Sequence, residues 1–269
     1  MEIRFKNFIF LGSKNSLDVT LEENKIISVI GKNGSGKTLL METLYGEYKK
    51  FSGSICVGNQ KLTLKSKIKD IKEFRKKVAY IRQEYLNDLN CKKISDYLNI
   101  RLMSNNERLD NLIKLFGLKQ EILLKSSLDL DEIEIKKIIL IKQILRNTPI
   151  LLLDDPTLGL DKKGIISLVK ILKEEKRNGK IIIITSNDTE FLFTISDCFL
   201  IIDNDKIYEE TDKYRLFSNK LLIAKLNLKV PNMLNFNMLA YRLKGVKLLY
   251  RDNVNDLLKE IYRNVETKK

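Results

Sequence analysis

A glycine-rich segment near the N-terminus has the residue types and spacing of a phosphate-binding loop. Its eight residues fit the pattern G-x-x-x-x-G-K-[ST] and are Gly31, Lys32, Asn33, Gly34, Ser35, Gly36, Lys37 and Thr38. In such a loop the glycines let successive backbone N–H groups converge on one phosphate. The lysine reaches the β- and γ-phosphates, and the final hydroxyl ligates Mg²⁺. The segment therefore predicts a site for a nucleoside triphosphate and Mg²⁺.

The sequence on either side of this loop supports the same prediction. Residues 25–30 form a short β-branched run that is typical of a buried strand. Residues 38–45 have the pattern of a helix, whose N-terminus would add a partial positive charge facing the phosphates. Strand, glycine loop and helix follow one another in the order that phosphate binding requires.

Polar residues end three other apolar, strand-like runs. They are Gln83, Asp154, and the pair Asn187 and Asp188. In a doubly wound sheet the carboxyl ends of the strands gather at one ligand crevice. Each residue taken singly fits a turn equally well, but three polar strand ends beside a phosphate loop favour a common site. We expect Asp154 to reach the Mg²⁺ held by Thr38, and Gln83 to reach this metal or the attacking water.

The order of elements predicts an α/β protein in which strands alternate with helices in a doubly wound sheet. The expected strands are residues 3–11, 17–21, 25–30, 51–58, 78–83, 149–154, 180–185 and 199–202. Residues 2–30 are expected to form a small antiparallel sheet that leads into the core strand, and residues 51–58 form another hairpin. Residues 84–147 form a helical insertion with amphipathic runs at residues 94–102 and 109–116, and residues 162–177 form a helix. Residues 216–269 form a separate C-terminal helical extension. Phe10 is either a core residue or an aromatic that stacks on an adenine.

Composition excludes several kinds of site. The chain of 269 residues has no histidine, so no histidine base, metal ligand or pH switch is available. Its three cysteines are widely spaced, and we expect them to be reduced. No apolar run reaches the ~18–20 residues that span a bilayer, and residues 1–6 lack the apolar run of a signal peptide, so we expect none. We expect a protein that is cytosolic or docked on a membrane from the cytosolic side.

A net charge of +14 has two interpretations. The first is an anionic partner, either nucleic acid or an acidic membrane surface. The second, which we favour because lysines occur along the whole chain, is a coding bias towards lysine that leaves a solvated surface.

The motifs together resemble an ABC-type ATPase over residues 1–210, and we expect the ATP-binding domain to cover residues 1–215. Residues 31–38, Gln83, residues 151–156 and residues 159–161 resemble its Walker A, Q-loop, Walker B and D-loop. Residues 221–231 and the helical pattern after them resemble the C-terminal extension of energy-coupling-factor (ECF) transporter ATPases. The resemblance implies a P-loop NTPase core of parallel and mixed sheet, with an antiparallel β subdomain and a helical subdomain. It also implies ATP and Mg²⁺ as ligands and a C-terminal extension that serves in dimerisation.

In that family two ATPase subunits pair, as a homodimer or a heterodimer, beneath a transmembrane coupling subunit. A separate substrate-binding membrane subunit selects a vitamin or metal ion. The resemblance thus implies a peripheral protein on the cytoplasmic side of the cell membrane, with no nucleic-acid partner.

Three positions depart from the family pattern. Asp155 stands where the family has its catalytic glutamate, and its side chain is one methylene shorter. Asn187 stands at the switch histidine and cannot carry a proton or a positive charge. Residues 130–134 replace the signature L-S-G-G-Q with L-D-E-I-E. Asp131 and Glu134 have the spacing of a capping box, which stabilises a helix but repels an incoming triphosphate.

These departures predict ATP binding with slow hydrolysis by an ABC importer ATPase, with Asp155 as base and Asn187 at the switch position. One alternative is a non-catalytic, ATP-gated regulatory subunit that pairs with an active ATPase. A third and less favoured hypothesis is a soluble ABC ATPase associated with nucleic acid, which the positive charge suggests.

Overall fold

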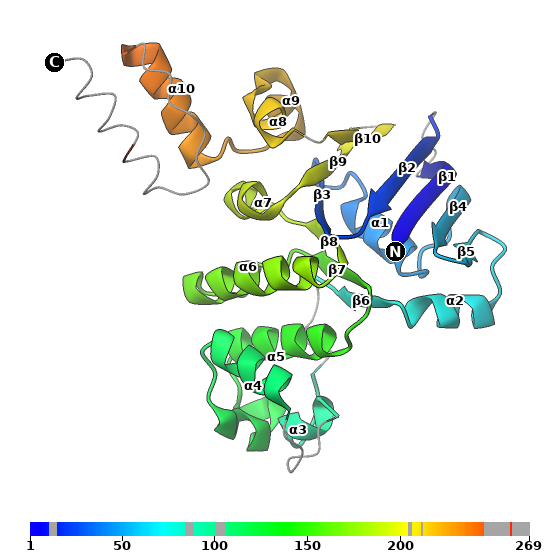
Figure 1. The fold of residues 1–269 in the computed structure, drawn as a ribbon, viewed down its shortest axis with the longest axis vertical. Coiled ribbons are helices and arrows are strands. Elements are labelled where there is room, and N and C mark those ends of the chain that lie inside the picture. The colour runs from blue at the N-terminus through cyan, green and yellow to red at the C-terminus, as the bar shows by residue number, and fades with distance from the viewer. Residues whose placement is uncertain are drawn as a thin grey trace.

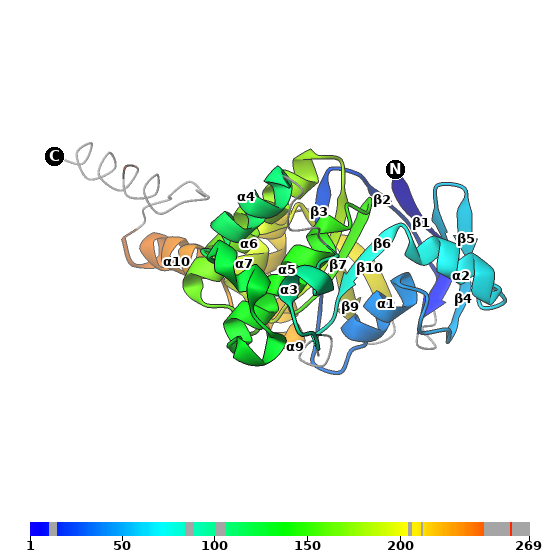
Figure 2. The ribbon, with the colours of Figure 1, turned by 90° about the horizontal axis from the view of Figure 1, so that it is seen from below.

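The computed structural model describes residues 1–10, 15–83, 89–99, 106–203, 206–210, 212–244 and 259. Two sheets organise it, with helices packed around the larger one (Figures 1 and 2). Among the described helices, none is long and apolar enough to cross a membrane.

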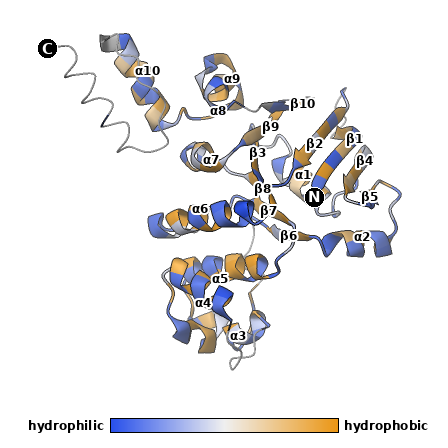
Figure 3. Cartoon of the chain, viewed as in Figure 1, coloured by the Kyte–Doolittle hydropathy of each residue, from blue (hydrophilic) through white to orange (hydrophobic). Residues whose placement is uncertain are grey.

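A six-stranded sheet forms the centre of the protein, in the order β10-β9-β3-β8-β7-β6. The strands are β3 (Lys25–Gly31), β6 (Val78–Ile81), β7 (Ile150–Asp154), β8 (Ile181–Thr185), β9 (Cys198–Asp203) and β10 (Lys206–Glu210). All neighbours are parallel except β9 and β10. Strands β7 and β8 are buried at every residue, which explains their unbroken runs of leucine and isoleucine (Figure 3). The predicted parallel sheet is confirmed, and β10 is an additional edge strand that the sequence did not predict.

Four helices flank this sheet, and each is connected to a segment that contains predicted site residues. They are α1 (Lys37–Leu44), α5 (Glu132–Leu145), α6 (Lys162–Arg177) and α7 (Thr189–Ile195). Helix α6 has the bounds that its apolar periodicity predicts. Because parallel pairing aligns Asp154 with Thr185 and Ile81 with Leu153, the carboxyl ends of β6, β7 and β8 meet at one edge.

A four-stranded antiparallel sheet, in the order β2-β1-β4-β5, lies beside the core. Its strands are β1 (Glu2–Phe10), β2 (Leu17–Glu22), β4 (Phe51–Val57) and β5 (Gln60–Leu62), and helix α2 (Ile68–Arg75) follows them. Phe10 is only 3% exposed, and its ring packs between Phe8 and Tyr48, with centroids 5.9 and 6.2 Å away. Phe10 is thus a core residue, and its ring offers no face to an adenine.

The region between β6 and β7 is helical where it is described. It contains α3 (Ile94–Tyr97), α4 (Glu107–Leu115), the 3₁₀ turns η2 (Gln120–Leu124) and η3 (Ser127–Asp129), and α5. We predicted a helix over residues 94–102, but α3 ends at Tyr97, and residues 100–105 lie outside the described part of the chain.

Helices α8 (Lys213–Ser218), α9 (Lys220–Leu226) and α10 (Asn232–Lys244) follow the last strand. They extend from the β10 end of the central sheet, on the side away from α3 and α4 (Figure 1). The C-terminal extension is helical as far as residue 244, and its proposed role in dimerisation stays a prediction.

Candidate nucleotide-binding site

The glycine loop joins the end of β3 to the start of α1, as predicted. Gly34 and Gly36 have φ values of 77° and 95°, which L side chains rarely adopt. A Cβ on Gly31 would lie 2.5 Å from the Ser35 hydroxyl and 2.6 Å from the carbonyl oxygen of Ile202. Among the described residues, no side chain caps the N-terminus of helix α1, and its first turn contains no acidic residue. Its terminal N–H groups therefore remain available to an anion.

The Lys37 ammonium lies within the loop itself. It donates hydrogen bonds to the carbonyl oxygens of Gly31, at 2.9 Å, and of Lys32, at 3.0 Å. Burial lowers the pKa of this ammonium, and the nearby carboxylates of Asp155 and Asp154 oppose that effect. A phosphate would offer the buried cation a charge-assisted acceptor in place of two neutral carbonyls.

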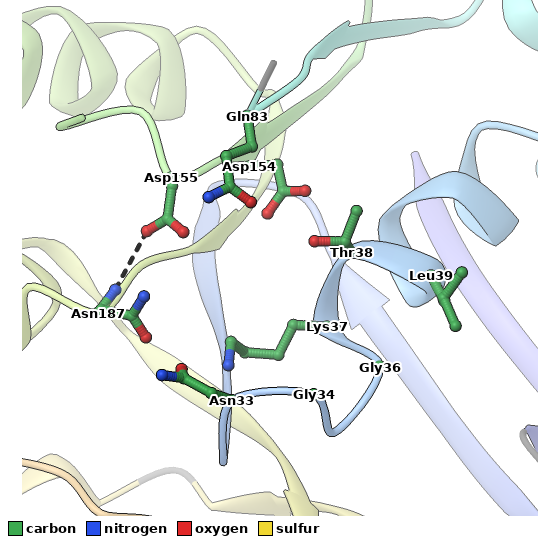
Figure 4. A pocket seen from close by; sticks show the side chains of 10 residues that line it. All are labelled: Asn33, Gly34, Gly36, Lys37, Thr38, Leu39, Gln83, Asp154, Asp155 and Asn187. Carbon is green, nitrogen blue, oxygen red and sulfur yellow. Dashed lines mark hydrogen bonds between the residues drawn. The ribbon is translucent and has the colours of Figure 1, made fainter. Parts of the chain in front are cut away.

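A cavity of about 420 Å³ opens above the loop (Figure 4). Its lining residues are Asn33, Gly34, Gly36, Lys37, Thr38, Leu39, Gln83, Asp154, Asp155 and Asn187. The structure thus brings together the glycine loop and three strand-end positions that are distant in sequence. Asp188 lines the adjoining cavity, and its carboxylate caps α7 by accepting a hydrogen bond from the Phe191 N–H at 3.1 Å.

Asp154 supplies the observation that bears on Mg²⁺. Its carboxylate is 1% exposed, and Oδ1 accepts a hydrogen bond from the Thr185 hydroxyl. Oδ2 is buried and has no hydrogen-bond partner among the described residues. The Asp154 carboxylate lines the cavity beside the Thr38 side chain (Figure 4). An unpaired carboxylate oxygen in such a position is unfavourable unless a cation arrives, so the residues present fit Mg²⁺.

Asp155 begins the turn after β7 with an unusual backbone. Its φ of 46° lies in the left-handed region, which aspartate tolerates better than most residues. Its N–H donates to the Thr185 carbonyl oxygen at 3.1 Å, and its Oδ1 accepts from the Asn187 N–H at 3.2 Å. Burial raises the pKa of this carboxyl group. The Asn187 side chain projects into the same cavity, towards Asn33 and Lys37 (Figure 4).

The turn that replaces the signature is built as predicted. Asp131 is the N-cap of α5, and its Oδ1 accepts from the Glu134 N–H at 2.7 Å. Glu134 returns the contact by accepting from the Asp131 N–H at 3.3 Å. The carboxylates therefore occupy N–H groups that a phosphate would otherwise use.

The sequence placed Ser35 in the glycine loop, but it did not predict the second polar residue described here, Lys136. The Ser35 hydroxyl is buried without a hydrogen-bond partner among the described residues, beneath the loop. Lys136 on α5 is fully buried, and burial lowers its pKa to about 8, with Asp155 and Asp154 opposing the shift. Nothing in the sequence distinguishes this lysine from the many that lie on the surface.

Comparisons with known proteins agree with this geometry. The family model described as "ABC transporter" matches residues 14–158. The energy-coupling factor transporter ATP-binding protein EcfA2 of Mycoplasmoides gallisepticum is 30% identical, over 94% of this chain and 86% of that protein. EcfA2 of Staphylococcus epidermidis is 26% identical, over 81% of this chain and 79% of that protein.

Among solved structures, cbiO1 from Clostridium perfringens, described as part of the ABC transporter complex cbiONQ, has a similar fold. Its TM-score is 0.66 and its identity 22%, over 87% of this chain and 97% of that one. The family model thus matches more than half of the sequence. The glycine loop, the acidic end of β7 and the order of the strands agree with this match. The chain belongs to the ATP-binding protein family of ABC transporters.

Proposed function

We propose that this chain is the ATP-binding subunit of an ECF-type importer, which binds Mg-ATP and hydrolyses it slowly. The observation that carries the proposal is the cavity lined by Lys37, Thr38 and Asp154, whose Oδ2 has no hydrogen-bond partner among the described residues (Figure 4). The Lys37 ammonium and the N–H groups at the start of α1 can hold a triphosphate. The Thr38 hydroxyl and the Asp154 carboxylate can hold the metal ion that accompanies it.

Each residue of the cavity has a distinct role in this proposal. The backbone of the glycine loop and the Lys37 ammonium would hold the phosphates, and Thr38 and Asp154 would hold Mg²⁺. Gln83 would contact this metal ion or the attacking water. When bound, Mg²⁺ supplies neutralising charge to the phosphate oxygens. Asp155 takes the position of the general base and orients the attacking water.

Slow hydrolysis follows from Asp155 and Asn187. Because the Asp155 side chain is one methylene shorter than that of glutamate, its carboxylate lies farther from the attacking water. A displacement of about 1 Å can reduce the rate ~10²-fold. Asn187 can donate a hydrogen bond to the γ-phosphate but brings no charge to the transition state. Both changes affect the nucleotide that is bound to this chain's own glycine loop.

The acidic turn at Asp131 affects a different nucleotide. In the ABC architecture that turn completes the nucleotide site on the partner's loop. In a dimer with an intact partner, the Asp155 and Asn187 changes would therefore lie in one site and the acidic turn in the other. We infer a second ABC ATPase subunit as the partner, in a homodimer or a heterodimer. The capping box also favours the second candidate function, an ATP-gated regulatory subunit whose partner performs the hydrolysis.

The names of the relatives support the remaining assignments. Because they are ECF transporter ATP-binding proteins, we infer a transmembrane coupling subunit and a substrate-binding membrane subunit as partners. The chain would sit peripherally on the cytoplasmic side of the cell membrane and power uptake of a vitamin or metal ion. Helices α3 to α5, which follow Gln83, would transmit ATP-driven closure to the membrane subunits.

The decisive experiment compares steady-state ATP hydrolysis by the purified chain with that of the variant Asp155→Glu/Asn187→His. If the proposal is right, both proteins bind ATP and the variant hydrolyses it at least tenfold faster than the wild type. A tenfold increase corresponds to an activation free energy that is lower by ~1.4 kcal/mol. If both bind ATP and neither turns over, the regulatory function replaces the proposal. If neither binds ATP, both candidate functions are wrong.

A further inference from the structure

The segment of residues 61–77, between β5 and β6, concentrates positive charge. Its basic residues are Lys61, Lys65, Lys67, Lys69, Lys72, Arg75, Lys76 and Lys77, and its acidic residues are Asp70 and Glu73. Helix α2 forms the centre of the segment and lies at the outer edge of the molecule, beside β5, in both views (Figures 1 and 2).

One face of α2 belongs to the core. Ile71 and Phe74 are 6% and 2% exposed. The Arg75 guanidinium turns inward as well, and donates hydrogen bonds to the carbonyl oxygens of Tyr45, at 3.0 Å, and Gly46, at 3.2 Å. These contacts fix the orientation of α2, so its opposite face is presented to the surroundings in a defined way.

Four exposed lysines lie on α2 or in the segment just before it, and the exposed acidic residues beside them are Asp70 and Glu73. Lys65, Lys67, Lys69 and Lys72 are all exposed, and none of the four forms an ion pair with an acidic side chain in the described part of the chain. Glu73 is engaged by Lys76 at 2.6 Å. We call these four lysines the lysine patch.

Two large apolar side chains stand among the lysines. Leu64 is 55% exposed and Ile68 is 71% exposed. Because residues four apart share one face of a helix, Ile68 and Lys72 project side by side from α2. Exposed aliphatic side chains surrounded by lysine ammonium groups are the composition of segments that bind anionic lipid surfaces.

We propose that the lysine patch, with Leu64 and Ile68 as apolar anchors, binds directly to the anionic headgroups of a phospholipid bilayer. This contact goes beyond the proposed function, because it attaches the chain to lipid itself and not through a protein partner. The two aliphatic side chains favour lipid over nucleic acid, since stacking on bases requires exposed aromatic or arginine side chains and Arg75 is turned inward.

Helix α6 offers an internal comparison. Its lysines Lys162, Lys163, Lys170 and Lys173 are equally exposed, and Ile166 among them is 56% exposed. This helix is separated from α2 in both views (Figures 1 and 2). These four lysines equal the lysine patch in number, but only one exposed aliphatic side chain lies among them. Substituting them therefore tests whether positive charge alone explains any lipid binding.

The first test is co-sedimentation of the full chain with vesicles. The vesicles consist of phosphatidylcholine alone or of equal parts phosphatidylcholine and phosphatidylglycerol. We expect binding only to the anionic vesicles, weakened by added salt. Each lysine near such a surface is worth about fivefold in partitioning, so K65Q/K67Q/K69Q/K72Q is expected to bind at least ~30-fold more weakly. The matched variant K162Q/K163Q/K170Q/K173Q is expected to lose less than ~5-fold.

The second test places a reporter on the apolar anchor. The chain has no tryptophan, so Ile68→Trp introduces a single one, and Ile166→Trp gives the matched control. We expect the emission of the first variant to shift to shorter wavelength, and to be quenched by brominated lipid, only when anionic vesicles are added. The control is expected to show neither change.

Three results would overturn the proposal: no binding to anionic vesicles, equal losses in the two lysine variants, or equal spectral responses at Ile68→Trp and Ile166→Trp. Binding of duplex DNA with the same lysine dependence and without vesicle binding would assign the patch to nucleic acid. ATP binding by each variant serves as the folding control, since none of these residues lines the nucleotide cavity. Lipid binding and ATP binding can therefore fail independently.

Discussion

The Asp155 carboxylate accepts a hydrogen bond from the backbone N–H of Asn187 at 3.2 Å, which joins the turn after β7 to the turn after β8. Both residues depart from the ABC pattern, and the structure couples them directly. The carboxylate is nevertheless held where burial raises its pKa above the ordinary value of 3.8.

This raised pKa of Asp155 predicts a dependence of stability on pH. A carboxyl group whose pKa is higher in the folded state destabilises the fold when ionised, and the cost disappears once the pH falls below its ordinary pKa. We expect Asp155→Asn to melt at a higher temperature than the wild type near pH 7, and the difference to vanish towards about pH 4. Scanning calorimetry across this range measures it. A constant difference at all pH values would show that ionisation of Asp155 is not its cause.

The left-handed backbone at Asp155 predicts a cost for restoring the family's glutamate. Aspartate tolerates a φ of 46° better than glutamate does. We expect Asp155→Glu to lose up to ~1 kcal/mol, or about 2–4 °C in melting temperature, even as it increases hydrolysis. Asn187→His, which changes no such backbone, is the control. A variant that is faster and fully as stable would contradict this strain argument.

The unpaired Oδ2 of Asp154 predicts where the metal acts. We expect Asp154→Asn to lose the additional thermal stabilisation that Mg²⁺ gives over ATP with EDTA, while its nucleotide-free form melts no lower than the wild type. Asp188→Asn is a matched control, because asparagine also caps helices and Asp188 lies outside the Mg²⁺ position. Differential scanning fluorimetry gives both values. If the Mg²⁺ increment survives in Asp154→Asn, Asp154 is not a metal ligand.

The capping box at α5 predicts an effect on stability that depends on side-chain chemistry. Because Asp131 accepts from the Glu134 N–H, Asp131→Ala is expected to lower the free energy of unfolding by ~1 kcal/mol. Asp131→Ser keeps an acceptor oxygen and is expected to cost only a few tenths. Urea unfolding distinguishes the two. Equal losses in both variants would mean that the acidic turn does not stabilise the helix through its cap.

The sequence predicted best what local rules determine. The glycine loop, the bounds of α6 and the Asp131 cap each depend on residues within one turn of one another. The gathering of Gln83, Asp154 and Asn187 at one edge followed from a general property of parallel sheets.

Tertiary context determined what the sequence did not reveal. Strand β10 is rich in charged residues and is strand-like only because β9 offers it an edge. The burial of Lys136 beneath the acids depends on how α5 packs, and the lysine itself has no distinguishing neighbour in sequence. The left-handed backbone of Asp155 is imposed by hydrogen bonds to β8.

The measurement that tests the central claim most directly is equilibrium binding of a fluorescent ATP analogue to the purified chain in the presence of Mg²⁺. We predict saturable binding by the wild type, at least tenfold weaker binding by Lys37→Ala (~1.4 kcal/mol), and unchanged binding by Lys49→Ala, an exposed lysine outside the cavity. Absence of binding, or equal binding by Lys37→Ala and the wild type, would contradict the assignment of this loop as the nucleotide site.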